Sequence, residues 1–245
     1  MGQDARTFTG ETKGGLSAGL SSNALKLIAC AAMFGDHAAK AWGATGILRV
    51  ILTQVTGRIA FPMFCFFLAE GFSRSRDRKA YLLRMVIFAC LAELPFNMAI
   101  FGRIWYPRHQ NTLFSLSLGL VMFFCLHAVE KRGSMRIEAA VAAQCAIVAG
   151  FAAAAQLLEV DYHARGLICM GIFYLLRNQQ RVFVTALGSL SINIPNFNNA
   201  GAFLSAIPLS AYDGRRGRAD MKYFFYVFYP AHLLVLHLLK GIVRA

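Results

Sequence analysis

Five ionisable side chains lie within long apolar stretches of this 245-residue sequence, where a charge is costly to bury. They are one aspartate, two histidines, one arginine and one glutamate: Asp36, His37, Arg58, Glu93 and His232. A neutral histidine acts as a general base near neutral pH, and a neighbouring carboxylate or guanidinium can orient it or stabilise developing negative charge. These residues therefore form a candidate catalytic set, provided that the fold brings them together.

The elements that must position this set are apolar segments of near-spanning length. The sequence is 57% hydrophobic and 15% charged, whereas soluble domains carry about 25% charged residues. The segments run near 25–45, 46–72, 81–101, 112–129, 137–158, 165–177, 181–194, 200–212 and 223–241. A spanning helix needs about 20 apolar residues. We therefore predict an all-α polytopic transmembrane helix bundle with about nine spanning segments (eight to ten), the count being least defined over 165–212.

The distribution of charge indicates orientation in a bilayer. The net charge of +13 would suit nucleic acid, but the Lys and Arg residues gather between apolar segments, as in 73–79 and 214–218. Nine crossings from a cytoplasmic N-terminus place most Lys and Arg on the cytoplasmic side, as the positive-inside rule requires. We predict a flexible cytoplasmic tail over 1–22, a single transmembrane domain over 23–245, a lipid bilayer as partner, and no nucleic acid. The six cysteines form no CxxC pair, so no metal site is predicted.

Depth along the helices brings the ionisable residues into one layer. At 1.5 Å per residue, His37 lies roughly 18 Å, Arg58 roughly 21 Å and Glu93 roughly 18 Å from the cytoplasmic ends of their helices. His232 lies roughly 14 Å from its own. We expect Asp36 to pair with Arg58 and Glu93 to orient a histidine. His37 is our candidate base, with His232 as its rival, and Arg58 could instead stabilise an oxyanion.

Helix breakers flank two members of this layer. Gly57 and Pro62 surround Arg58, and Pro95 follows Glu93 by two residues. Proline in a membrane helix frees carbonyl groups that neighbours or water must satisfy. We therefore expect kinked or unwound helices beside a hydrated cavity.

Polar residues outside the layer have less specific roles. Lys40, near the outer end of its helix, can extend its ammonium to the interface. Gln110 and Asn111 precede the fourth segment, where Asn111 could cap a helix and the pair could instead bind a polar substrate. Asp161 and His163 are interpreted as outer-loop residues and not as zinc ligands.

Several stretches together resemble the TraX family of integral membrane acetyltransferases, whose best-known member acetylates the amino terminus of F-type pilin. The resemblance covers residues 20–240 and is carried by LSSNALKLIACAAMFGDH, TGRIAFPMFCFFLAEGFSRSRDRKAYLLRM, AELPFNM, QNTLFSLSLGL and FYVFYPAHLLVL. Within the last stretch, Tyr229 is a candidate substrate-binding residue. A relation to the wider superfamily of transmembrane acyltransferases is also expected.

The resemblance implies acetyl-CoA as the acyl donor and acetyl transfer to an acceptor amine, most simply the amino terminus of a conjugative pilin. Phosphate groups of acetyl-CoA suit the basic inner loop, namely Arg74, Arg76, Arg78, Lys79 and Arg84, and could also bind the basic run over 215–218. The implied location is the bacterial inner membrane, with pilin or another envelope acceptor as partner. The alternatives are an acyltransferase acting on a cell-envelope glycan or lipid headgroup, a proton-coupled transporter, and a non-catalytic assembly factor.

Overall fold

A computed structural model describes residues 19–195 and 199–244, without the side chains of 241–244, so most of the predicted tail lies outside the described residues. In chain order its helices are α1 (Ser22–Trp42), α2 (Gly46–Arg49), π-helix η1 (Val50–Thr56), α3 (Gly57–Arg74), α4 (Arg78–Phe96), π-helix η2 (Asn97–Phe101), α5 (Thr112–Lys131), α6 (Ile137–Leu157), α7 (His163–Leu175), α8 (Arg181–Asn193), 3-10 helix η3 (Ala200–Ser205), α9 (Ala206–Ser210) and α10 (Lys222–Arg244). The described residues contain isolated bridges and no β-strand, which confirms the all-α fold.

Every predicted apolar segment is helical, and the chain is a multi-pass membrane protein. Among the described residues, five helices are long and apolar enough to span a bilayer: Gly46–Arg74, Arg78–Phe101, Thr112–Lys131, Ile137–Leu157 and Lys222–Lys240. The segment with three charged residues, α1, and the 13-residue helices α7 and α8 do not meet that criterion. Helices α7 and α8, with 13 residues each, extend only about 20 Å, so they are shorter than those five.

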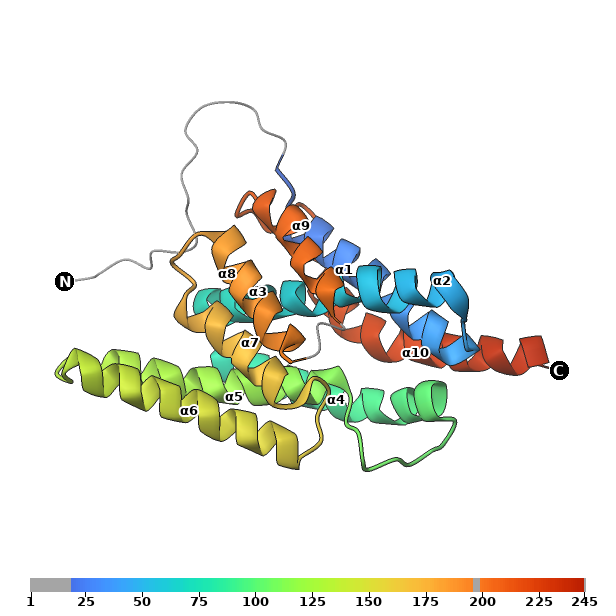
Figure 1. Cartoon of the computed structure of the whole chain (residues 1–245), viewed down its shortest axis with the longest axis horizontal. Coiled ribbons are helices and arrows are strands. Elements are labelled where there is room, and N and C mark those ends of the chain that lie inside the picture. The colour runs from blue at the N-terminus through green and yellow to red at the C-terminus, as the bar shows by residue number, and fades with distance from the viewer. Residues whose placement is uncertain (1–18, 196–198, 245) are drawn as a thin grey trace.

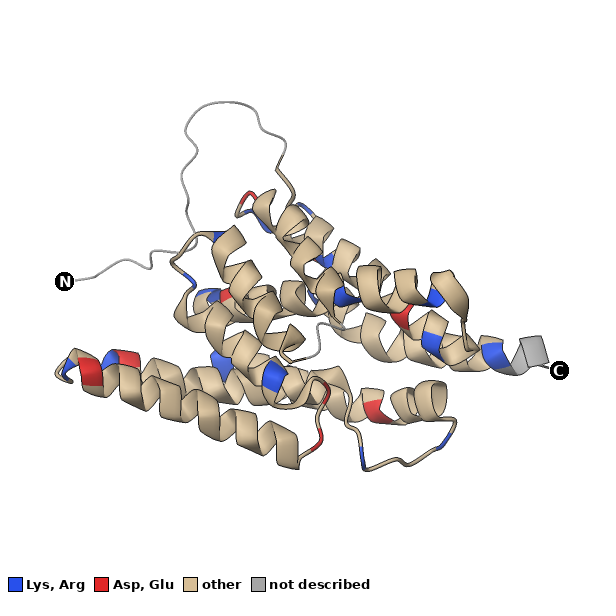
Figure 2. Cartoon of the chain, viewed as in Figure 1, with Lys and Arg blue, Asp and Glu red and all other residues tan. Residues whose placement is uncertain are grey.

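Helix α3 runs through the middle of the bundle (Figure 1) and packs on α1, α5 and α7. Helix α1 packs between α3 and α10, and α4 packs on both α10 and α5. The antiparallel pair α5–α6 lies along one edge of the molecule, and α7 fills the space between α6 and α3. Charged residues of the α5–α6 pair gather at its turn (Figure 2), so its length presents an apolar surface that suits lipid.

The predicted helix irregularities are present as two π-helical turns. Helix η1 ends where Gly57 begins α3, and η2 begins at Asn97, two residues after Pro95. A Cβ at Gly57 would lie 2.6 Å from both the Asp36 Cβ and the Leu52 carbonyl oxygen, so only glycine permits this approach of α1. The Thr53 hydroxyl donates to the Arg49 carbonyl at 2.8 Å, so this carbonyl, just before η1, has a side-chain hydrogen-bond partner. Such turns recur at functional sites.

Candidate functional site

Two histidines from α1 and α10 meet inside the bundle. His37 Nδ1 lies 2.8 Å from His232 Nε2, and the two rings are nearly parallel, at 6°. Their side chains come from helices that pack directly on each other, and the residues are only 6% and 5% exposed. The predicted convergence of the two histidines is therefore observed.

Hydrogen bonding assigns the tautomers of the neutral pair. His232 Nδ1 lies 2.8 Å from the Phe228 carbonyl oxygen, which can only accept, so Nδ1 carries the proton. His232 Nε2 then holds a lone pair and accepts the N–H of His37 Nδ1. The lone pair of His37 consequently lies on Nε2, for which no hydrogen-bond partner occurs within residues 19–195 and 199–240. This arrangement makes His37 the better base and His232 its orienting partner.

The predicted partners of Asp36 and Arg58 were wrong. Asp36 Oδ2 accepts a hydrogen bond from Lys40 Nζ at 2.6 Å, one helical turn along α1, so Lys40, whose side chain is 39% exposed, forms the ion pair expected of Arg58. Arg58 instead donates to the Tyr162 hydroxyl at 3.3 Å. The pairing fails because a lysine four residues away reaches the carboxylate within one helix. Arg58 does not line the cavity described below, and a role in oxyanion stabilisation remains a prediction.

Glu93 does not orient either histidine. Its Oε2 accepts a hydrogen bond from Asn111 Nδ2 at 2.6 Å, and its Oε1 accepts one from Asn97 Nδ2 at 3.2 Å. Asn111 also caps α5, its Oδ1 accepting the Leu113 N–H at 3.0 Å. The capping interpretation of Asn111 is thus confirmed, and Glu93 holds the start of α5 against α4. Gln110 donates to the Pro107 carbonyl at 2.9 Å within its loop.

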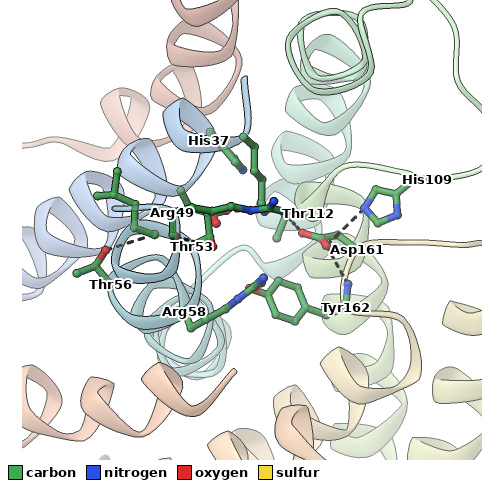
Figure 3. A network of polar contacts seen from close by, with 12 residues as sticks. His37, Arg49, Thr53, Thr56, Arg58, His109, Thr112, Asp161 and Tyr162 are labelled. Carbon is green, nitrogen blue, oxygen red and sulfur yellow. Dashed lines mark hydrogen bonds and ion pairs between the residues drawn. The ribbon is translucent and has the colours of Figure 1, made fainter. Parts of the chain in front are cut away.

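A second polar cluster, absent from the predicted set, forms around Asp161 in the loop between α6 and α7 (Figure 3). One carboxylate oxygen accepts the Thr112 hydroxyl; the other accepts the Tyr162 N–H at 3.1 Å and lies 3.5 Å from His109 Nε2. The Ser115 hydroxyl donates to the Asp161 carbonyl at 2.6 Å. The loop interpretation holds for Asp161, whereas His163 begins α7. The hydroxyl partners Thr112 and Ser115 lie more than 45 residues from Asp161 in sequence, so no local pattern could have revealed them.

The charges of this cluster reinforce each other. Burial alone would raise the pKa of the Asp161 carboxyl, but hydrogen bonds from His109 and Thr112 hold that pKa well below its usual range. The same hydrogen bond to Asp161 raises the pKa of His109. An aspartate and a histidine therefore form an ion pair where the loop before α5 meets the loop between α6 and α7.

A cavity of about 520 Å³ approaches the histidine pair. Along α1 it is lined by Asn23, Lys26, Cys30 and Met33, which are spaced three and four residues apart and so share one helix face. The next position on that face is His37. The cavity wall on α1 therefore leads directly to the candidate base.

Helix α10 lines the same cavity with a matching stripe. Its contributors include Lys222, Tyr226 and Tyr229, again at helical spacing, and His232 follows one turn further. The Tyr229 ring centroid lies 6.0 Å from that of His37 and 5.6 Å from that of His232. The predicted substrate-binding residue Tyr229 thus separates the end of the cavity from the histidines.

Basic side chains gather at the other end of the cavity. The cations that line it are Lys26, Arg74, Arg84, Arg216 and Lys222, and one carboxylate, Glu70, lies among them. Glu70 is engaged by Arg74 at 3.2 Å and by the Tyr212 hydroxyl at 2.7 Å. Lys26 Nζ lies 5.0 Å from the Phe67 ring centroid, and no ion pair forms at it within the described part of the chain. The cluster therefore carries an excess of positive charge.

Only part of the predicted basic loop belongs to this cluster. Arg74 and Arg84 line the cavity, whereas Arg76, Arg78 and Lys79 do not. Arg78 donates to the Phe72 carbonyl at 2.9 Å and lies over the Phe72 ring. Sequence reasoning could not separate these five cations because they lie in one short stretch, 74–84. Lys26 and Lys222 reach the cavity from near the N-terminal ends of α1 and α10.

The sequence is also similar to known proteins. It matches the family described as "TraX protein" over residues 21–240. A protein of Dichelobacter nodosus named "Probable fimbrial assembly protein FimC, serogroup H1" is 30% identical over an alignment of 237 positions. The alignment covers 86% of this chain and 92% of that protein. No solved structure matches. The family match spans nearly all of the described helices, and this chain therefore belongs to the TraX family.

Proposed function

We propose that this protein is a membrane acetyltransferase that moves an acetyl group from acetyl-CoA to an acceptor amine. The observation that carries the proposal is the cavity with five cations at one end and Tyr229, in contact with the His37–His232 pair, at the other. A polyanionic donor with a long neutral arm and a reactive thioester at its tip has the same order of chemical groups. The family membership supports the same activity.

The basic end of the cavity would hold the phosphate groups of acetyl-CoA. Arginine binds phosphate through two parallel hydrogen bonds, and lysine adds a compact charge. The buried Nε of Arg84 has no hydrogen-bond partner within the described residues. A phosphate oxygen of acetyl-CoA could accept a hydrogen bond from it. This assignment adds Lys26 and Lys222 to the predicted Arg74, Arg84 and Arg216, and it leaves Arg76, Arg78 and Lys79 outside the site.

His37 would serve as the general base for the acceptor. Acetyl-CoA supplies an activated acyl group, so an N–C bond forms as the C–S bond breaks and CoA leaves as its thiolate. His37 Nε2 takes the proton of the attacking amine and delivers it to that thiolate, which restores the neutral ring. His232 stabilises the charged intermediate form of His37 by accepting its Nδ1–H, and the Phe228 carbonyl fixes His232 in turn.

The acceptor is proposed to be the amino terminus of a pilin subunit. The similar Dichelobacter protein is named for fimbrial assembly, which supports an acceptor from a surface fibre. We place the protein in the bacterial inner membrane with its N-terminus in the cytoplasm, since that topology puts most basic residues inside. The basic end of the cavity, near the starts of α1 and α10, would then face cytoplasmic acetyl-CoA.

The proposal is tested with purified protein, acetyl-labelled acetyl-CoA and three acceptors: a pilin amino-terminal peptide, a cell-wall glycan fragment and a lipid headgroup sugar. We expect label on the peptide amine with wild type, little with His37→Ala, and full labelling with His127→Ala. His127 is a matched control because it pairs with Glu130, 3.5 Å away on α5, and does not line the cavity.

Each alternative has its own result. Label on the glycan or sugar alone would assign a different acceptor. A wild-type protein that neither binds acetyl-CoA nor transfers its label would exclude the enzyme, and proton uptake by reconstituted vesicles would then identify a transporter. A protein that shows neither activity but binds pilin would be an assembly factor.

A further inference from the structure

We infer that Tyr229 is a specificity-determining residue that restricts the donor to short acyl groups, and that Asp161 holds it in place through Thr112. The inference rests on the proposed function, because it concerns which acyl thioester the same cavity accepts. It assigns a role to Asp161 and Thr112, two residues for which the acid–base chemistry above has no use.

Tyr229 stands where the acyl end of a donor would stop. It lines the cavity together with Thr112 and Leu113 from the start of α5, and it is only 3% exposed. Its ring contacts both imidazole rings. An acyl group that approaches His37 from the basic end therefore meets the Tyr229 ring, and every additional methylene must displace it.

The hydroxyl of Tyr229 is fixed at two points on α5. It accepts the Thr112 N–H at 3.3 Å and donates to Thr112 Oγ1 at 3.5 Å. The Thr112 hydroxyl proton is committed to the Asp161 carboxylate, so Thr112 Oγ1 has its lone pairs free for Tyr229. The chain of donors thus runs in one direction, from Tyr229 through Thr112 to Asp161.

Asp161 is itself held by separate elements. Backbone hydrogen bonds join the two outer loops, from the Gln110 N–H to the Glu159 carbonyl at 3.0 Å and from the Asp161 N–H to the Gln110 carbonyl at 3.1 Å. His109 and the Tyr162 N–H occupy the other carboxylate oxygen. A tyrosine secured in this way is a rigid wall, and close-packed walls reject extra volume.

Acyl-length preference measures this role directly. Rates of transfer from acetyl-CoA, propionyl-CoA and butyryl-CoA are compared for wild type, Tyr229→Ala and Thr112→Val. One methylene in an apolar pocket changes specificity by roughly 10-fold or more. We expect the butyryl-to-acetyl ratio to rise at least about 10-fold in Tyr229→Ala and by a smaller factor in Thr112→Val.

Three variants separate a positioning role from general loosening. Thr112→Ser keeps the hydroxyl and should restore the wild-type ratio. Ser115→Ala removes only the hydrogen bond to the Asp161 backbone carbonyl, and Tyr226→Phe alters the cavity wall one turn closer to the basic end; neither should move the ratio. Gel filtration and thermal unfolding identify any variant that is misfolded, in which case Tyr229→Leu replaces Tyr229→Ala.

The outcomes are distinguishable. If wild type transfers acetyl groups while Tyr229→Ala and Tyr229→Leu keep its butyryl-to-acetyl ratio, Tyr229 does not set acyl length. If Thr112→Ser and Thr112→Val behave alike, the link to Asp161 is refuted. If wild type transfers no acyl group from any of the three thioesters, the proposed function is refuted, and this inference is refuted as well.

Discussion

The histidine pair and the Asp161 cluster are both polar groups within a largely apolar bundle, yet they use their hydrogen-bonding capacity differently. Asp161 has partners on both carboxylate oxygens and on its backbone carbonyl. His37 uses Nδ1 alone, and its Nε2 has no partner among the described residues. A saturated group stabilises the arrangement of the chain, whereas a group with an unused lone pair can act on a substrate.

The two regions also differ in how they are assembled. The histidine pair joins two long helices that run side by side, so its position follows from helical spacing. The Asp161 cluster joins loops whose residues Tyr162 and His163 have positive φ values of 62° and 46°. Such backbone conformations cost about 1–2 kcal/mol for residues other than glycine. The side-chain and backbone contacts of Asp161 hold the loop in this conformation.

The largest expected effect is the loss of activity when His37 is replaced, with stability nearly unchanged. His37→Ala should lower acetyl transfer by roughly 100-fold to 10,000-fold, as loss of a general base does, with little change in the thermal unfolding temperature. Initial rates and unfolding curves on the same preparation check both. Normal transfer by His37→Ala would show that the pair is structural, like the Asp161 cluster.

Asp161→Ala, unlike His37→Ala, should lower the stability of the protein. It leaves the Thr112 hydroxyl and His109 without their acceptor, which costs about 1–3 kcal/mol of unfolding free energy. Denaturant unfolding in detergent measures this loss, with Asp220→Ala as the control, because Asp220 pairs with Arg216 at an exposed site. Equal stability of the two variants would contradict the structural role of Asp161.

Replacing a cation at the basic end of the cavity should have an intermediate effect, on the KM for acetyl-CoA. Lys26→Ala should raise the KM for acetyl-CoA by about 10-fold at nearly constant kcat, since it weakens donor binding without touching the reacting atoms. Arg76→Ala, which removes a cation of the predicted basic loop that does not line the cavity, should leave the KM unchanged. A matching rise in both variants would indicate a diffuse electrostatic effect.

The smallest effect concerns pH and the His109–Asp161 pair. His109 has a raised pKa in the folded protein, so its protonation stabilises the fold. This contribution to the free energy of unfolding is complete below the unfolded pKa of about 6.5, and it is lost as pH rises through the folded pKa. Asp161 has a lowered pKa, so its contribution is lost only in acid. Stability should thus fall by about 1 kcal/mol or less across that rise, and His109→Gln should abolish the fall. A fall of equal size in His109→Gln would assign it to another group.

Much of the architecture was predictable because helix position follows from apolar length. The nine predicted segments are helical, and depth along them brought His37 and His232 to one level. Partner choice was not predictable in the same way. Asp36 pairs with Lys40 on its own helix, a short-range alternative to Arg58. Glu93 instead binds Asn111 at the start of the neighbouring helix α5. Asp161 was missed since its partners lie in distant loops, although Thr112 stood beside the predicted Asn111.

The central claim is that His37 is the base and His232 its orienting partner, and one set of rates tests it most directly. Acetyl transfer is measured for wild type, His37→Ala, His232→Ala and the double variant. We predict that His37→Ala and the double variant are equally inactive, while His232→Ala retains part of the activity, because residues that act as a unit are not additive. Full activity in His37→Ala with none in His232→Ala would contradict the account.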